Sequence, residues 1–108
     1  MPWTVETLND TVDAELARLP ADMRARFHHI VRLIEEFGIN QVGQPHVKYL
    51  RSGLWEMRMR ARDGISRALY ITAVGEPVVV LRVFVKKTQK TPEQEIRLAL
   101  KRAREMEP

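Results

Sequence analysis

Charged and apolar side chains alternate in the stretch of this sequence that has the clearest capacity for chemistry. In residues 54–61 the charged side chains stand at even-numbered positions and the large apolar ones at odd-numbered positions. The charged residues are Glu56, Arg58 and Arg60, and the apolar ones are Trp55, Met57 and Met59. Successive side chains of a β-strand point to opposite faces, so this pattern predicts a half-buried strand with a charged face. Such a face suits a polyanion, and a carboxylate enclosed by arginines makes acid–base chemistry on that polyanion conceivable.

Positive charge is concentrated in the middle of the chain. The 108 residues carry a formal net charge of +4, but residues 46–90 hold 10 Lys and Arg against 3 Asp and Glu, whereas residues 1–45 hold 4 against 7. A basic composition spread over the whole surface would favour no particular partner. The clustering of Lys and Arg around the predicted charged strand favours a nucleic acid as the partner.

Apolar periodicity and turn residues predict the elements that must position this strand. Apolar residues recur at helical spacing in residues 12–19 and 23–37, which predicts two helices with Pro20 between them and Gly38 after the second. Turn-forming residues separate short runs of β-forming residues. These runs predict strands at residues 3–8, 46–50, 54–61, 65–73 and 78–86.

Capping residues mark where the helices begin. Thr91, Pro92 and Gln94 match a capping box with proline at the first helical position. They predict the start of a final helix. Asn9 or Asp10 is expected to cap the first helix, because both side chains accept hydrogen bonds from free N–H groups at helix starts.

The order of these elements predicts the fold class. With the final helix over residues 92–106, we expect a single α+β domain over residues 1–108. An N-terminal strand and a helical hairpin would pack on a small antiparallel sheet with a C-terminal helix. Residues 78–85 are apolar at even and odd positions alike, apart from Arg82, so both faces of this strand should be covered.

The composition argues against a metal site and a membrane span. The sequence contains no Cys and three His, and His28 and His29 point about 100° apart on the predicted helix, so they cannot chelate one ion. A surface position is expected for both, and no metal or small-molecule cofactor is expected. No apolar run reaches the roughly 18 residues of a membrane span, and the first residues lack the layout of a signal peptide. A cytoplasmic protein is expected.

Three segments of the sequence resemble a known family. They are residues 49–58, 64–70 and 81–92, and the most specific of them contains Phe-x-Lys-Lys-Thr-x-Lys-Thr-Pro at residues 84–92. Together they resemble the phage-derived Gp49-like branch of the RelE/HigB toxin superfamily. The resemblance implies a RelE-like fold and a toxin of a type II toxin–antitoxin module, whose partner is a small helix-turn-helix antitoxin. It also implies an endoribonuclease that cuts mRNA in the ribosomal A site without a metal, by attack of a ribose 2′-OH that leaves a 2′,3′-cyclic phosphate.

The resemblance also assigns roles to particular residues. It implies a catalytic set and an RNA-binding set: Arg67, Arg58, Glu56, Lys86 and Lys87 for catalysis, and Lys48, Arg60, Tyr70 and Lys90 for binding RNA. Arg58 and Arg67 would contact the scissile phosphate, and Arg67→Ala would abolish cleavage while leaving the fold intact. The general base would be Glu56, a lysine with a lowered pKa or His46, of which Glu56 is narrowly favoured. The proton donor is left open.

Several of these assignments have structural alternatives. Glu56 beside arginines is more often a salt-bridge partner than a base. Arg67 shares its parity with Leu69 and Ile71, so it reaches solvent only near a strand end or through a bulge. Tyr70 suits the core better than a platform for stacking on RNA bases. RelE-like folds also include ParE-type proteins that act on DNA gyrase, so a noncatalytic toxin that acts by binding is the alternative function.

Overall fold

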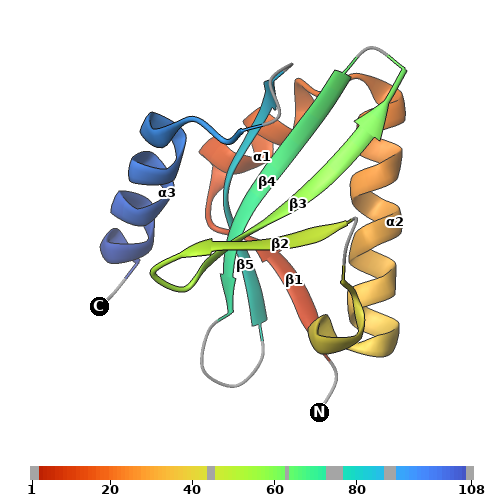
Figure 1. Ribbon diagram of the computed structural model, residues 1–108, viewed down its shortest axis with the longest axis horizontal. Coiled ribbons are helices and arrows are strands. Elements are labelled where there is room, and N and C mark those ends of the chain that lie inside the picture. The colour runs from red at the N-terminus through yellow and green to blue at the C-terminus, as the bar shows by residue number, and fades with distance from the viewer. Residues whose placement is uncertain (1–2, 44–45, 63, 73–76, 87–89, 107–108) are drawn as a thin grey trace.

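A five-stranded sheet with helices on both faces forms the molecule (Figure 1). The computed structural model describes residues 3–43, 46–62, 64–72, 77–86 and 90–106. Each predicted strand and helix is present within a few residues of its expected bounds, which confirms the α+β fold. In chain order the elements are β1 (Thr4–Thr7), α1 (Asp10–Ala17), α2 (Ala21–Phe37), the short 3-10 helix η1 (Ile39–Gln41), β2 (Val47–Arg51), β3 (Leu54–Ala61), β4 (Gly64–Thr72), β5 (Pro77–Lys86) and α3 (Glu93–Glu105).

The strands lie in the order β1-β5-β4-β3-β2. Strands β2 to β5 pair antiparallel with their neighbours in the chain, as the turn residues predict. Strand β1 joins the edge of this antiparallel sheet, where it pairs parallel to β5. The reason is that both helices and three strands separate β1 from β5, and a long connection permits a parallel pair. Strand β5 lies inside the sheet with apolar side chains buried on both faces, as expected, although Val85 near its end is 44% exposed.

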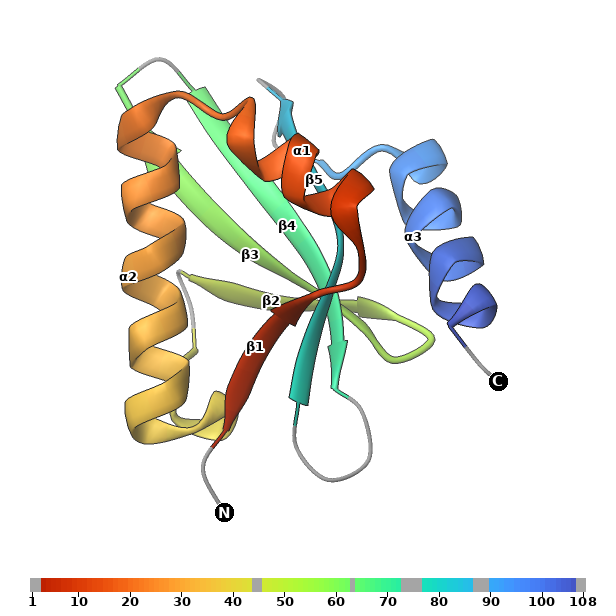
Figure 2. The same ribbon diagram turned by 180° about the vertical axis from the view of Figure 1, so that it is seen from behind.

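Apolar side chains pack on both faces of the sheet. Helices α1 and α2 cover one face, and α3 covers part of the other (Figure 1, Figure 2). The larger core joins α2 to the sheet through Met23, Phe27, Ile30, Ile34, Met57, Met59 and Tyr70. The smaller core lies under α3 and contains Leu54, Leu69, Leu81, Ile96 and Ala99. Because α3 covers only part of its face, charged side chains of β2 and β3 can reach solvent beside it.

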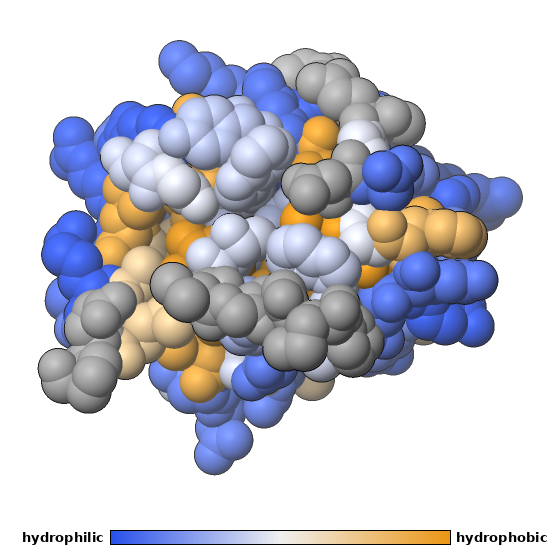
Figure 3. All heavy atoms as spheres, turned by 90° about the horizontal axis from the view of Figure 1, so that it is seen from below, coloured by the Kyte–Doolittle hydropathy of each residue, from blue (hydrophilic) through white to orange (hydrophobic). Residues whose placement is uncertain are grey.

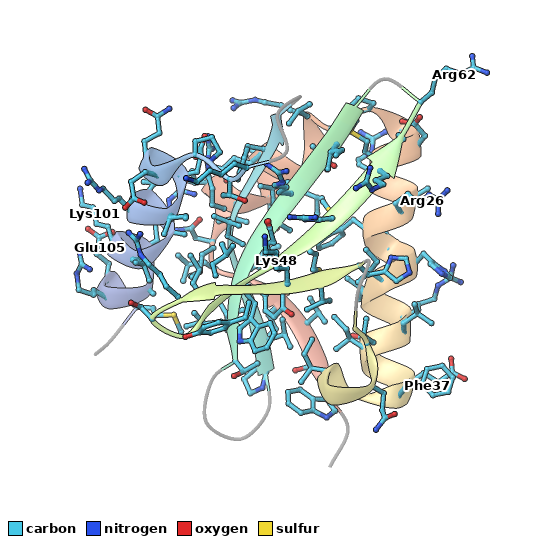
Figure 4. The ribbon with its side chains drawn as sticks, viewed as in Figure 1. Arg26, Phe37, Lys48, Arg62, Lys101 and Glu105 are labelled. Atoms are coloured by element: carbon cyan, nitrogen blue, oxygen red, sulfur yellow. The ribbon has the colours of Figure 1, made fainter. Side chains whose placement is uncertain are left out.

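The apolar stripe of α2 ends before the helix does. Ile34 is fully buried, but the side chain of Phe37 is 57% exposed. Figure 4 shows Phe37 at the end of α2, pointing away from the sheet. The prediction that Phe37 belongs to the buried stripe is therefore wrong, because the last turn directs this side chain outward.

The two predicted helix caps have different outcomes. Asn9 caps α1, because its Oδ1 accepts a hydrogen bond from the N–H of Val12 at 3.1 Å. The capping box before α3 is wrong: Pro92 takes the cap position, and no side chain caps the helix. Thr91 instead turns its hydroxyl to the carboxylate of Glu56, at 2.8 Å from each oxygen. A buried carboxylate without a hydrogen-bond donor costs more free energy than a free N–H at the start of a helix, because that N–H can bond to water.

An ion-pair network fixes α1 and α3 against β5. The buried carboxylate of Glu15 lies 2.8 Å from Arg82 and 2.9 Å from Arg102, and it also accepts a hydrogen bond from the N–H of Val83 at 3.1 Å. Arg82 makes a second ion pair with Glu95 of α3 at 2.7 Å. Strand β1 pairs with β5 only as far as Val80, so the N–H of Val83 has no partner in β1. Glu15 supplies the acceptor for this N–H.

Glycine is required at the end of α2. Gly38 has φ +87° and ψ 153°, a backbone conformation that costs other residues about 1–3 kcal/mol. A Cβ at this position would also lie 2.9 Å from Nε1 of Trp3. We therefore expect Gly38→Ala to lower the free energy of unfolding by about 1–3 kcal/mol, as measured by urea denaturation. Gly43→Ala is the control, because a Cβ there meets nothing within 4 Å, and equal losses in the two variants would contradict the prediction.

One end of the molecule carries an apolar cavity of about 440 Å³. Figure 3 views the molecule from this end, where apolar surface lies between hydrophilic side chains. The rings of Tyr49 and Trp55 meet edge to face in its wall, with their centroids 4.9 Å apart. Among the described residues that line this cavity, Lys48 is the one with a charged side chain. The cavity therefore differs in character from the charged surface of β3.

Candidate nucleic-acid interface

Strand pairing brings four of the predicted site residues to one face of the sheet. Lys48 of β2 lies opposite Glu56 of β3, and Arg58 of β3 lies opposite Arg67 of β4. Side chains of directly opposed residues project to the same face. This is the face that α3 partly covers, and Figure 4 shows Lys48 lying over the middle of the sheet. The structure therefore brings together the residues that the sequence placed on separate strands.

Glu56 is the centre of this group. Its side chain is fully buried, and its Oε1 lies 3.6 Å from Nε of Arg58 and 3.7 Å from Nε of Arg67. Thr91 supplies a hydroxyl donor to the same carboxylate. A general base must reach the proton that it removes, whereas this carboxylate is enclosed by its three partners. The geometry supports Glu56 as the residue that positions two arginines, and it argues against Glu56 as the base.

Arg67 lies beneath the surface. Its side chain is fully buried, so the expectation that it reaches solvent is wrong. A bulge does occur in this region, but it lies between Leu69 and Tyr70, where β5 carries an extra residue, and it leaves Arg67 buried. Burial lowers the pKa of Arg67, Glu56 opposes this effect, and the charges of Arg58 and Arg60 lower the pKa further. An arginine nevertheless keeps its charge near neutral pH.

Arg58 is the arginine of this pair that faces solvent. Its side chain is 18% exposed. Its Nε is buried and donates no hydrogen bond to any residue within the described ranges. Arg60, two positions further along the same face of β3, is exposed. A ligand with negative charge would therefore meet Arg58 and Arg60 first, with Arg67 adding positive charge from behind.

A groove of about 720 Å³ runs between β2 and the start of α3. It is lined by Lys48 and Lys90, two of the predicted RNA-binding residues, and by Thr91. Arg51 and Glu93 flank it with a two-pronged ion pair, one contact of which measures 2.8 Å. The hydrogen bond from Arg51 lowers the pKa of the Glu93 carboxyl. The groove gives an extended ligand a basic path beside the arginine pair.

The remaining predicted site residues are Tyr70, Lys86 and Lys87. Tyr70 is fully buried in the core between the sheet and α2, and burial raises the pKa of its hydroxyl above the usual range. A role for Tyr70 in stacking on RNA is therefore wrong for this conformation. Lys86 ends β5, with its backbone opposite Ile65, but its side chain lies outside the described part of the chain. Lys87 lies wholly outside the described residues.

Sequence reasoning missed two features of this region. Thr91 was interpreted as a helix cap, and nothing in the local pattern showed that it contacts Glu56 from 35 positions away. No role was assigned to Arg26 or His29 of α2, which are exposed and share a small pocket with His46, Arg58 and Arg60. Their spacing of three residues places them on one helical face, which was the available signal.

Within the described ranges no three His, Asp or Glu side chains gather as a metal site, and no helix is long and apolar enough to cross a membrane.

Comparison with known proteins identifies the family. Residues 14–104 match the phage-derived Gp49-like proteins. The chain belongs to this Gp49-like family. Comparison with curated proteins gives no sequence match.

Two solved structures share the fold of this Gp49-like chain. A mutant of the E. coli toxin RelE in the free state has a TM-score of 0.67 and 16% sequence identity, covering 94% of this chain and 98% of that chain. An archaeal RelE–RelB complex from Pyrococcus horikoshii has a TM-score of 0.58 and 19% identity, covering 83% and 100% of the two chains. At these identities the likeness establishes a RelE-like fold.

Proposed function

We propose that this protein is the toxin of a type II toxin–antitoxin module and an endoribonuclease that cuts mRNA in the ribosomal A site. Family membership and the RelE-like fold support the toxin role. The observation that carries the nuclease proposal is the pair Arg58 and Arg67, held by one enclosed carboxylate beside a groove with two lysines. An oriented pair of guanidinium groups on a basic surface suits the charge of a phosphodiester under attack.

The reaction sets clear demands on the site. The 2′-oxygen forms a new bond to phosphorus while the bond from phosphorus to the 5′-oxygen breaks. The 2′-OH must lose a proton, the 5′-oxygen must gain one, and the phosphorane between them carries extra negative charge. Arg58 contacts this phosphate, and Arg67 strengthens the positive potential from behind. Because Glu56 is enclosed, the proton acceptor is a lysine, His46 or water.

Mapping of mRNA 5′ ends tests the proposal. The protein is induced in bacteria, and the purified protein is added to programmed ribosomes. We expect cuts within A-site codons that leave 5′-hydroxyl ends and 2′,3′-cyclic phosphates. Growth arrest without such cuts would contradict the nuclease proposal. If DNA gyrase were inhibited at the same time, the noncatalytic ParE-type alternative would replace it.

The proposal includes an antitoxin partner. The RelE-like fold occurs in a RelE–RelB complex, which supports a toxin that pairs with a small second protein. We propose a helix-turn-helix antitoxin encoded beside this gene and a toxin that acts in the cytoplasm. Coexpression of the neighbouring open reading frame should restore growth and yield a stable complex on copurification. Failure of every neighbouring frame to restore growth would contradict this partner.

Glu56→Gln separates a positioning role from a general-base role. Glutamine keeps a hydrogen-bond acceptor for Thr91 but loses the charge that holds Arg58 and Arg67. We expect the cleavage rate to fall by about tenfold, or about 1.4 kcal/mol of transition-state stabilisation, because the two ion pairs that orient the arginines are lost. The rate should retain the same dependence on pH as in the wild type. Loss of the low-pH limb of the pH–rate profile would instead identify Glu56 as the base.

A further inference from the structure

A small pocket between α2 and β3 is lined almost entirely by basic side chains. Its volume is about 190 Å³, and its lining consists of Arg26, His29, Ile30, His46, Arg58 and Arg60. No described carboxylate lines it. The pocket shares no described residue with the groove that holds Lys48 and Lys90.

The elements hold these side chains together for simple geometric reasons. Arg26 and His29 are three residues apart and therefore neighbours on one face of α2. Arg58 and Arg60 are two residues apart on one face of β3. The carbonyl of His46 accepts a hydrogen bond from the N–H of Arg58 at 2.8 Å, which fixes His46 beside β3. Figure 4 shows Arg26 on α2 beside the end of β3.

Such a cluster is electrostatically unfavourable without a ligand. Three arginines around one cavity repel one another, and the described lining offers no opposite charge. Of the three arginines, Arg58 has its Nε turned toward Glu56, at 3.6 Å from Oε1, without a hydrogen bond within the described ranges. An anion in the pocket would offset the repulsion among the arginines. Protonation of His29 and His46 would add further positive charge to the lining.

We propose that this pocket binds one phosphate of an RNA strand, next to the phosphate held by Arg58 and Arg67, and that its two histidines make this binding stronger at lower pH. The charged groups that line the pocket with the two imidazoles are Arg26 from α2 and Arg58 and Arg60 from β3. Because all three are cations, a bound phosphate provides the compensating charge. The identity of the strand as RNA rests on the proposed function, whereas the anion site rests on the pocket itself.

The three histidines of the chain allow a direct test by NMR. The probe is a short single-stranded RNA with 2′-O-methyl groups, which cannot be cleaved because its 2′-oxygens are blocked. We expect the imidazole signals of His29 and His46 to move during titration, while those of exposed His28, the adjacent residue on α2, stay in place. The affinity should rise severalfold between pH 7.5 and pH 5.5, where histidine gains its charge. RNA binding that leaves the signals of His29 and His46 unchanged, or that moves His28 equally, would overturn the proposal.

Substitutions on α2 provide the matched comparison. Arg26→Ala should weaken binding by about tenfold, the loss expected for one hydrogen bond to a charged group. It should also lower the slope of log affinity against log salt by about 0.7, the value for one lost phosphate contact in a single strand. Arg32→Ala is the control, because Arg32 is an exposed arginine of the same helix that does not line the pocket. Equal effects of the two substitutions would show general attraction to α2 and overturn a specific site.

The outcomes for the pocket and for the nuclease are distinguishable. The binding assay contains no ribosome and no cleavable bond, so the expected shifts without any nuclease activity would support the pocket and contradict the proposed function. Cleavage by the wild type, with Arg26→Ala binding RNA as the wild type does, would support the nuclease and contradict the pocket. His29→Gln combined with His46→Gln should remove the pH dependence of affinity, and its persistence would contradict the role of the imidazoles. Shifts with inorganic phosphate but none with the RNA probe would limit the site to free phosphate.

Discussion

Replacing Arg58 with alanine is expected to lower the rate of ribosome-dependent mRNA cleavage by about 10²–10³-fold, the typical loss for one positioned donor to a developing negative charge. The reason is that Arg58 presents its guanidinium to solvent at the centre of the basic face, with Glu56 holding its orientation. Its loss removes charge stabilisation from the phosphorane. The measurement is the single-turnover cleavage rate on programmed ribosomes.

Controls separate this effect from general loss of charge or of structure. Arg62→Ala removes an exposed arginine from the turn after β3, which lies away from the site (Figure 4). This variant should cleave within a few-fold of the wild type. Because Arg58 is partly exposed, Arg58→Ala should change the free energy of unfolding by only about 1 kcal/mol. Wild-type cleavage by Arg58→Ala would place the phosphate elsewhere.

Replacing Arg67 with alanine is expected to lower the free energy of unfolding by about 3–5 kcal/mol, the cost of breaking a buried ion pair from one side. The side chains of Arg67 and Glu56 are both fully buried, and Glu56 would keep its charge with one cation fewer. This result would overturn the sequence-based expectation that the variant keeps its fold intact. Urea denaturation followed by circular dichroism measures the loss.

A double substitution tests the cause of that instability. Arg67→Met combined with Glu56→Leu removes both buried charges and should recover part of the lost stability, because no unpaired charge remains. Loss of cleavage in Arg67→Ala has to be measured well below its unfolding temperature. A stability loss under about 1 kcal/mol would contradict the structural role of Arg67 and support direct contact with the phosphate.

Local patterns in the sequence were sufficient for the elements and for the apolar face of β3. The alternation in residues 54–61 identified β3 and correctly assigned Met57 and Met59 to the core, because side chains of a strand alternate whatever surrounds them. Pro20 and Gly38 marked helix boundaries because their backbone restrictions are also local. Parity further indicated that Arg67 shares a face with apolar residues. These inferences needed no knowledge of distant contacts.

The character of the site depends on segments that are far apart in the chain. Parity shows which side chains share a face, but it cannot show which part of that face another segment covers. The approach of Thr91 and the start of α3 encloses Glu56, which changes its role from a candidate base to a group that positions arginines. In the same way, the packing of α2 beside β3 brings Arg26 and His29 to Arg58. Burial and electrostatic potential are sums over such neighbours, so they follow from tertiary packing and not from spacing along the chain.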